Sequence, residues 1–362
     1  MTQVSRQYFK DRFVVTITVQ DRHEGVRLDQ FMVDHFGTIS RQYIKKKIAS
    51  GEIIIVNRPV TLKSSVKVHY GEVVKMEVKN VDDEVIYWRG DTFNVSQYPE
   101  VLFNNEHVAV VDKPPYMATH PTGRHLFNCV TVYLADFLKK NVHSVHRIDR
   151  ETSGILILAK SVKVASILTN YFEARLVRKV YFFIGVKNEQ YKNPTFPFIA
   201  NERIRRNDDA PGLQKLISSY HDQNSQEGKK AQTEFNLLYE NEKYIVGLAC
   251  PKTGRQHQIR VHALANGFPL LGDKLYIGGA DLFSRFKDNL ATDYDHELME
   301  IARHALHAVA INFPDKYLED TPSSFMSKIP SDLEEWLVNK LNLDIVEINH
   351  LMHEKIKAYF NA

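Results

Sequence analysis

The chain has 362 residues, 43% of them hydrophobic, which is enough to bury the cores of two domains. It has only two cysteines, far apart at Cys129 and Cys250, which excludes a disulfide framework or cysteine zinc site and favours a reducing compartment. No apolar run reaches the length of a membrane span, and the histidine spacing fits no helical metal pair, so we expect a soluble protein without a metal site.

The net charge of +3 is unevenly distributed, and its distribution matters more than its sum. Residues 1–90 hold 15 lysines and arginines against 11 acids, whereas residues 316–362 hold 5 against 8. The first twenty residues include Arg6, Lys10 and Arg12, so organellar targeting stays open if the source is eukaryotic. The β-branched residues 14–19 favour a first strand instead, and we expect a cytoplasmic protein.

Two short helices are predicted next. Residues 28–36 have apolar side chains at helical spacing, and Gly37 ends this helix. Ser40 caps a second helix that continues through Ile48, with Gly51 as its stop. Residues 53–57 and 66–74 predict two strands joined by a turn at residues 57–59.

The second helix presents a basic face, which suits RNA phosphates but is also compatible with a merely solvated surface. Residues 25–74 as a whole resemble the small RNA-binding module named after a ribosomal small-subunit protein and found in tyrosyl-tRNA synthetases. That resemblance implies RNA contacts from four residues: Arg27, Arg41, Lys45 and Lys46. Such contacts position a protein on RNA without reading its sequence. We therefore expect residues 1–90 to form an α+β RNA-binding module with its core at 25–74.

Residues 80–100 lack apolar periodicity and predict a linker to a second domain, residues 91–315. Strands are predicted at 108–111, 142–145, 155–159, 180–186, 232–238, 244–249 and 305–311, and helices at 130–139, 162–174 and 257–266. This mixture lacks regular β-α alternation, so it indicates an α+β fold rather than a doubly wound parallel sheet.

Three further segments are expected around these elements. Residues 201–230 predict a loop, and residues 283–300 a helical or loop insertion without an assigned function. The tail, residues 316–362, has helical patterning near 333–341 and 348–356, and we expect it to pack on the domain rather than on a partner helix.

Asp149 is the most informative residue. It lies in a basic turn between two predicted strands, where Arg147 and Arg150 favour its ionised form. By itself, such a turn is more often a capped loop with surface ion pairs. However, the string His-Arg-Ile-Asp-Arg-Glu-Thr-Ser-Gly at 146–154 resembles the His-Arg-Leu-Asp-x-x-Thr-Ser-Gly signature of the RluA-type pseudouridine synthases.

Other strings strengthen this resemblance. Lys-Thr-Gly-Arg-Gln-His-Gln-Ile-Arg-Val-His at 252–262 is similar to the family's Thr-Gly-Arg-x-His-Gln-Ile-Arg-x-His element, and Arg-Lys-Val-Tyr at 178–181 is similar to its Lys-x-Tyr segment. Residues 112–115 resemble its Lys-Pro turn, and residues 267–273 its Gly-His-Pro-Ile-x-Gly-Asp loop, with Phe268 in place of histidine. Together the likeness covers roughly residues 100–313.

The resemblance implies roles for particular residues. Asp149 is then the nucleophile toward the ribose or carbon 6 of uracil, and Arg255 pairs with it. Tyr181 packs against the flipped uracil and helps remove the proton from carbon 5. Further RNA contacts are expected from Arg147, His257 and Arg260. The implied fold is a long, mostly antiparallel mixed sheet with a central cleft.

The implied activity is isomerisation of uridine to pseudouridine in a structured RNA, a ribosomal or transfer RNA stem-loop. Because this reaction changes neither the atoms nor the oxidation state, no cofactor is expected, nor any membrane or nucleotide partner. The alternative is a non-catalytic RNA-binding or RNA-folding protein on the same fold. A kinase is disfavoured because Ile148 separates Arg147 from Asp149 and no Asp-Phe-Gly follows. The RNA target and the oligomeric state stay open, with a monomer favoured.

Overall fold

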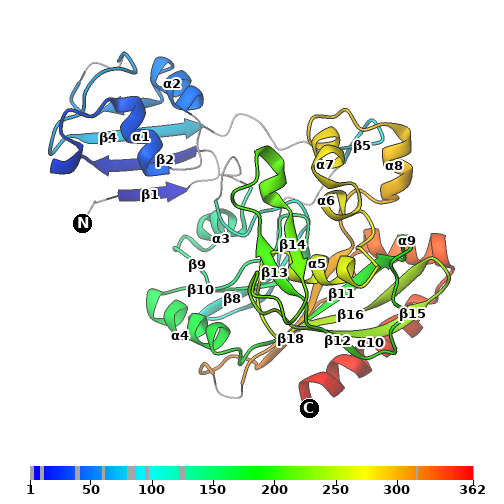
Figure 1. Ribbon diagram of the computed structural model, residues 1–362. Coiled ribbons are helices and arrows are strands. Elements are labelled where there is room, and N and C mark those ends of the chain that lie inside the picture. Colours follow the sequence, from blue (N-terminus) through cyan, green and yellow to red (C-terminus); the bar gives the residue numbers. More distant parts are fainter. Residues whose placement is uncertain are drawn as a thin grey trace. The chain divides into compact units, whose positions relative to one another are not determined.

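The structure is a computed structural model that describes residues 4–8, 12–36, 41–58, 62–79, 86–93, 98–121, 128–314 and 317–361 (Figure 1). By its internal contacts, the chain divides into two compact units. The first is residues 1–84 with 118–142, and the second is residues 85–117 with 143–362. The expected boundaries at residues 90 and 315 stay a prediction. Within the described ranges, no helix is long and apolar enough to cross a membrane.

The first unit contains a four-stranded antiparallel sheet in the order β1-β2-β4-β3. Its strands are β1 (Val4–Tyr8), β2 (Arg12–Thr18), β3 (Ile53–Ile55) and β4 (Val73–Lys79). Helices α1 (Leu28–Phe36) and α2 (Arg41–Ala49) pack their apolar residues on this sheet, and a 3-10 turn, η1 (Asp21–His23), precedes them. The segment 118–142 of the same unit contains α3 (Val130–Leu138).

The helices predicted in this unit are confirmed, but one strand is not where we predicted it. Residues 66–72 form a single bridge at Lys67 and a turn, and β4 begins only at Val73. Gly71 explains the difference, because its φ of 80° is incompatible with an extended strand. The predicted helix stop Gly37, the predicted cap Ser40 and the turn residue Pro59 lie outside the described residues.

The second unit is built on a ten-stranded sheet whose main path runs β12-β15-β16-β11-β17-β10-β8-β7. Only β10 and β17 pair in parallel among its described strands, so the predicted long, mostly antiparallel mixed sheet is confirmed. The strands are β7 (Glu100–Asn104), β8 (Val108–Lys113), β9 (His143–Ser144), β10 (Ser153–Ala159), β11 (Arg178–Val186), β12 (Phe198–Ala200), β15 (Thr233–Glu240), β16 (Tyr244–Pro251), β17 (Leu306–Asn312) and β18 (Ser324–Met326).

Strand β11 divides its side chains between two cores. Val180, Phe182 and Ile184 pack with α9 (Ser331–Leu341) and α10 (Ile345–Asn361), so the tail packs on the domain as predicted. The intervening residues Tyr181 and Phe183 face the opposite side of the sheet, where α5 (Gln258–Ala265) lies. Odd-numbered residues at the start of β11 therefore point toward the α5 side.

Strand β10 approaches β17 unusually closely at Gly154. This glycine has a φ of 108°, and a Cβ there would collide with the backbone of Ala308. Only glycine therefore allows the parallel pairing of Ser153 with His307 and of Gly154 with Ala308. Helix α4 (Val162–Glu173) then packs on β10 from the side.

Two connecting segments have more structure than their sequences indicated, and a third agrees with its prediction. The predicted loop 201–230 contains the hairpin β13 (Arg203–Arg206) and β14 (Ser218–His221) with a 3-10 turn, η2 (Gly212–Leu216). The predicted linker 80–100 contains the hairpin β5 (Ile86–Trp88) and β6 (Asp91–Phe93). Helix α6 (Lys274–Ile277) leads into α7 (Gly279–Lys287) and α8 (Asp293–Met299), which form the predicted insertion.

Candidate active site

Asp149 lies in the loop that connects β9 to β10, as the two flanking strand predictions required. Its carbonyl oxygen accepts a hydrogen bond of 3.1 Å from the backbone N–H of Thr152, which closes a tight turn. The preceding residue, Ile148, is buried and anchors the loop to the domain. The side chain of Asp149 is about one quarter exposed, at 26%. The carboxylate is therefore fixed in position but accessible.

A buried lysine holds the loop on one side. Lys113, at the end of β8, is fully buried, and its Nζ donates to the carbonyl oxygens of Pro114, Met117 and Arg150 at 2.9, 2.8 and 3.1 Å. Because Arg150 follows Asp149 directly, this lysine connects the loop that carries Asp149 to the end of strand β8. Three carbonyl acceptors replace the water that a buried ammonium loses.

A buried arginine holds the loop on the other side. Arg303 donates from Nη1 to the carbonyl oxygen of Glu151 at 3.3 Å, and its Nε and Nη2 contact both carboxylate oxygens of Asp332 in α9 at 2.7 and 3.0 Å. Thr152 is held in addition by His304, with 2.7 Å between Oγ1 and Nε2. Helix α9 thus stabilises, through Arg303, the loop that carries Asp149.

The guanidinium of Arg260 is the charge partner of Asp149. Its Nη1 donates to Oδ2 of Asp149 at 3.0 Å, while Nε and Nη2 donate to the two oxygens of Asp273 at 2.7 Å each. Asp273 is fully buried and also caps α6. Bidentate pairing with Asp273 fixes the guanidinium plane, so the remaining nitrogen is aimed at Asp149.

His257 lies on the same side of Asp149. Its Nε2 is 3.8 Å from Oδ2 of Asp149, and its Nδ1 is 3.0 Å from the hydroxyl of Tyr276. That hydroxyl already accepts a hydrogen bond from the backbone N–H of Ser218, so its own proton is available for Nδ1. This arrangement assigns the imidazole proton to Nε2, facing the carboxylate.

These contacts keep Asp149 ionised. Burial raises the pKa of its carboxyl, but the positive charges nearby and the hydrogen bond from Arg260 outweigh burial and lower the pKa. Burial also lowers the pKa of His257 to about 4, so its ring is neutral at neutral pH. The lasting positive charge beside Asp149 is therefore that of Arg260, whose pKa Asp273 and Asp149 raise further.

Tyr181 lies across from Asp149 on β11. Its ring belongs to the aromatic core on the α5 side, next to Phe183 and Ile259. Burial and the negative charge of Asp149 both raise the pKa of its hydroxyl, which is therefore protonated at neutral pH. The ring thus offers a flat surface with a neutral hydroxyl group.

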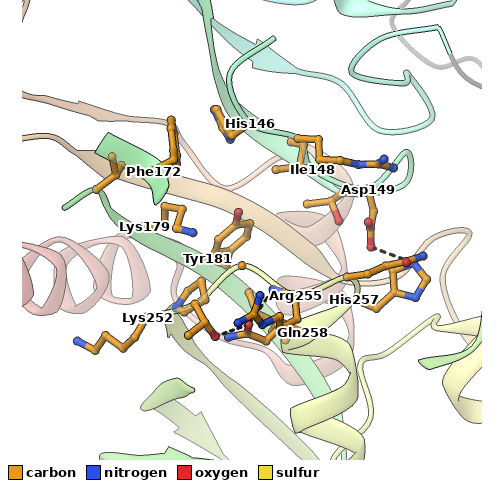
Figure 2. Close-up of a pocket in the computed structure, with 18 of the residues that line it drawn as sticks. His146, Ile148, Asp149, Phe172, Lys179, Tyr181, Lys252, Arg255, His257 and Gln258 are labelled. Atoms are coloured by element: carbon orange, nitrogen blue, oxygen red, sulfur yellow. Dashed lines mark hydrogen bonds and ion pairs between the residues drawn. The ribbon is translucent and has the colours of Figure 1, made fainter. Parts of the chain in front are cut away.

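A cleft of about 810 Å³ joins these residues (Figure 2). Every site residue predicted in the second unit lines it, and the central cleft expected across the sheet is present: Arg147, Asp149, Tyr181, Arg255, His257 and Arg260. Among the described residues, no group of three or more histidine, cysteine or acidic side chains is arranged to hold a metal ion.

The prediction that Arg255 pairs with Asp149 is wrong in this structure. The Nε of Arg255 donates to the carbonyl oxygen of Lys230 at 3.1 Å, and Arg260 occupies the position next to Asp149. The chain reverses between the two arginines, because His257 adopts a left-handed φ of 54° before α5 begins. Both arginines belong to the same sequence string, and spacing alone could not decide which one faces Asp149.

The side chain of Gln258 fixes that reversal. Its Oε1 accepts from the hydroxyl of Thr253 at 2.6 Å and from the backbone N–H of Arg255 at 3.0 Å. Its Nε2 donates to the hydroxyl of Thr233 on β15 at 2.9 Å. The motif string therefore folds onto the sheet through one amide side chain, which was not singled out among the predicted site residues.

Two further residues of the site, besides Gln258, were not predicted. Asp273 belongs to the string at 267–273, which resembled a family loop, but its sequence gave no sign that it would hold Arg260. Lys179 belongs to the Lys-x-Tyr string and lines the cleft two residues before Tyr181. Its period-two relation to Tyr181 on one strand was the signal that could have revealed it.

The remaining predicted RNA-binding residues lie in the first unit. Arg27 and Arg41 both donate to the buried carboxylate of Asp29 at distances of 3.1–3.2 Å, and each side chain stays 45% exposed. Lys45 and Lys46 on α2 are exposed. Burial alone would raise the pKa of the Asp29 carboxyl. The hydrogen bonds from both arginines outweigh burial and lower this pKa to about 2. It thereby fixes two guanidinium groups at the surface.

Comparisons with known proteins agree on one family. The family model described as RNA pseudouridylate synthase matches residues 107–265. An "Uncharacterized RNA pseudouridine synthase" of Aquifex aeolicus (strain VF5) is 31% identical over 265 residues, which are 70% of this chain and 77% of the relative. The ribosomal large subunit pseudouridine synthase D of Vibrio vulnificus (strain CMCP6) is 26% identical over 342 residues, 92% of this chain and 96% of the relative.

A solved structure shares the fold. Human RNA Pseudouridylate Synthase Domain Containing 4 superposes with a TM-score of 0.52 at 22% identity, covering 68% of this chain and 94% of the human chain. The strings at residues 146–154 and 252–262 both lie within the residues that the family model matches. The chain therefore belongs to the RluA-type RNA pseudouridine synthases, isomerases that act on uridine in RNA.

Proposed function

We propose that this protein converts specific uridines of a structured RNA to pseudouridine, with Asp149 as the nucleophile. The observation that carries the proposal is the carboxylate of Asp149, accessible in a cleft and held by the guanidinium of Arg260 at 3.0 Å. A nucleophile needs to be ionised and aimed, and Arg260 does both. In the proposed reaction the bond between ribose and N1 breaks, the uracil turns, and carbon 5 bonds to the ribose; carbon 5 then loses its proton and N1 gains one, so the atoms of uridine and pseudouridine balance.

The target uridine is proposed to leave its stack and enter the cleft. Flipping a base costs a few kcal/mol, and least in loops, which favours a stem-loop substrate. The ring of Tyr181 supplies an apolar surface against which a uracil packs. Because the raised pKa of Tyr181 keeps its hydroxyl protonated, packing is the role we propose for it rather than that of a base. Arg147, exposed at the cleft, is proposed to contact the RNA backbone or the vacated stack.

The first unit is proposed to dock the RNA. Arg27 and Arg41 are fixed side by side on Asp29, so a phosphate would meet two guanidinium groups that have already lost part of their side-chain freedom. Lys45 and Lys46 add exposed positive charge on α2. Contacts of this kind bind the RNA backbone and weaken as salt rises.

The class of RNA is proposed from the relatives. The Vibrio vulnificus protein is named for the large ribosomal subunit and matches 92% of this chain, so we propose ribosomal RNA ahead of transfer RNA. Sequencing that maps pseudouridine in total RNA from cells with and without this gene tests the proposal. Sites that vanish only from transfer RNA would reverse this order.

The nucleophile is tested by removing its charge. Asp149→Ala and Asp149→Asn should abolish pseudouridine formation in an unmodified RNA transcript while RNA binding stays within about twofold. Asp281→Asn, which neutralises an exposed aspartate on α7, is the matched control and should retain full activity. Undiminished product from Asp149→Ala would remove the nucleophile assignment and leave RNA binding as the activity.

The docking role is tested separately in the full-length chain. Replacing Lys45 and Lys46 together with glutamine should weaken RNA binding and lower the slope of log affinity against log salt by roughly 1.5 to 2. Lys63→Gln, an exposed lysine in a loop of the same unit, is the control. An unchanged slope in the double variant would exclude phosphate contacts from α2.

A further inference from the structure

Lys179 lines the catalytic cleft without a role in the mechanism so far. It precedes Tyr181 by two residues on β11, so both side chains lie on the same face of the sheet, toward α5. Figure 2 shows the Lys179 nitrogen directed toward the Tyr181 ring, with Asp149 on the other side of that ring. Burial and the charge of Asp149 raise the pKa of Tyr181, whereas burial alone lowers the pKa of Lys179. Tyr181 therefore lies closer than Lys179 to the charge of Asp149, as the arrangement in Figure 2 indicates.

Lys179 is half-buried, and it differs from the buried Lys113 and Lys274 in its lack of a hydrogen-bond acceptor within the described part of the chain. Lys113 donates to three carbonyl oxygens, and Lys274 donates to the carbonyl oxygen of Ala302 at 2.6 Å. Among the described residues, the Lys179 ammonium group makes no hydrogen bond within 3.5 Å and no ion pair within 4.0 Å. An ammonium group that is partly desolvated in a cleft and unpaired carries an uncompensated cost, which is typical of a group whose partner is the ligand.

The position of Lys179 identifies the part of the ligand it faces. In the proposed function, the glycosidic bond of the flipped uridine lies near Asp149 and the uracil ring packs on Tyr181. The ring atom opposite N1 is carbon 4, so its carbonyl oxygen O4 points away from Asp149. That direction is toward Lys179, on the far side of Tyr181.

We propose that Lys179 is a further catalytic residue, which donates a hydrogen bond to O4 of the flipped uracil and stabilises the negative charge that develops there. The inference rests on the proposed function and deepens it. It assigns Lys179 to the base itself and leaves the RNA backbone to the arginines of the cleft.

This role holds for both routes of attack. If Asp149 bonds to the ribose, the bond from ribose to N1 breaks, and its electron pair spreads over N1, O2 and O4 of the departing uracil. If Asp149 bonds instead to carbon 6, the electrons of the double bond between carbons 5 and 6 move to O4 as an enolate. In either case O4 gains charge, and a fixed cation beside it lowers the barrier.

The rotation of the uracil preserves the contact. Turning the ring about the axis through N3 and carbon 6 exchanges N1 with carbon 5 and O4 with O2. After the turn, O2 faces Lys179, so the same ammonium group serves the ring before and after it rotates. A lysine suits this task because its three donors rotate freely on a flexible stem.

Lys179 is positively charged at neutral pH, although burial lowers its pKa to about 8. Two other titratable groups face it. Burial lowers the pKa of His146 to about 3, and burial with the charge of Asp149 raises that of Tyr181, so neither changes protonation between about pH 6 and 9. A rate that depends on charged Lys179 should therefore fall as the pH rises through about 8.

The test compares Lys179→Met, Lys179→Arg and Lys355→Met in full-length protein, with an unmodified large-subunit ribosomal RNA transcript mixed with transfer RNA transcripts. Lys355 is exposed on α10, so its variant controls for the loss of one charge. We expect Lys179→Met to lower the single-turnover rate about 100-fold or more with RNA affinity within about twofold. Lys179→Arg should retain most of the rate and lose its decline above about pH 8.

Each outcome decides one question. Weaker RNA binding by Lys179→Met at an unchanged rate would reassign Lys179 to the RNA backbone, and an unchanged rate and affinity would exclude any role. If Lys179→Met does not fold, the pH profiles decide: a wild-type rate that is flat through pH 8 overturns the inference. If the wild-type protein forms no pseudouridine in any transcript, the proposed function fails instead.

Discussion

Arg260 should contribute far more than Arg255 to the unfolding free energy and to the rate of isomerisation, although both arginines belong to one sequence string. The variants Arg260→Gln and Arg255→Gln test this prediction when their urea unfolding and their single-turnover rates are compared. Arg260 makes three charged hydrogen bonds of 2.7, 2.7 and 3.0 Å, and its loss leaves the fully buried Asp273 without a counter-charge. Such a loss costs about 3–5 kcal/mol of unfolding free energy.

Arg255 gives a much smaller expected effect. Its side chain makes one hydrogen bond, to a backbone carbonyl at the surface, so Arg255→Gln should cost less than about 1.5 kcal/mol. The double variant Arg260→Gln with Asp273→Asn should recover much of the lost stability, because no uncompensated charge is then buried. It should not recover the rate, since Asp149 still lacks its partner.

The pH dependence supplies an independent check. In the wild-type protein, the pKa of Asp149 lies below its ordinary value of 3.8, so ionisation of this group is complete well below neutral pH. Without Arg260, burial dominates and raises that pKa, so the acid limb of the rate profile should move to higher pH. Equal stability losses in the two single variants, or an acid limb that stays in place in Arg260→Gln, would refute this reasoning.

Three further predictions follow from the fold. Gly154→Ala should lower the unfolding free energy by more than about 3 kcal/mol, because the residue has a φ of 108° and a Cβ there would collide with the backbone of Ala308. A Cβ at Gly254 would meet no atom within 4 Å, so the control Gly254→Ala should change the unfolding free energy by less than about 1 kcal/mol. Asp332→Asn should slow isomerisation while RNA affinity stays constant, because Arg303 then holds the Glu151 carbonyl less firmly; weaker binding at an unchanged rate would contradict this. The unfolding free energy should fall as the pH drops below about 6.5, because the unfolded chain then protonates histidines that the folded protein buries as neutral rings. Each such histidine contributes a loss of up to about 1.4 kcal/mol per pH unit. Urea unfolding at several pH values measures this loss. These histidines are His146, His257 and His307.

Local patterns in the sequence were sufficient for most elements of the second unit. Strands such as 155–159 and 180–186 are apolar on both faces because helices cover the sheet, so their runs are unmistakable. The hairpin at 203–206 and 218–221 escaped prediction because it is largely polar and only partly buried, and a polar strand has the composition of a loop. Tertiary pairing, which composition does not encode, forms it.

The same limit applies to the site. The strings that contain Asp149, Tyr181 and Arg260 were identified, and all three residues line one cleft. The partner of Asp149 was misassigned, because it depends on how the chain reverses at His257 and on the buried Asp273, thirteen residues beyond Arg260. A contact of this kind is set by the path of the backbone rather than by spacing along the string.

The pairing of Asp149 with Arg260 has a second chemical consequence. A carboxylate that forms a covalent bond to the substrate in one step has to be expelled from it in a later step, and a weaker base is the better leaving group. Arg260 binds only Oδ2 of Asp149 and so can remain in place while Oδ1 bonds to carbon and departs again. If Asp149 is the nucleophile, as we propose, the arginine that makes it available for attack also makes the adduct reversible, as an enzyme that regenerates itself requires.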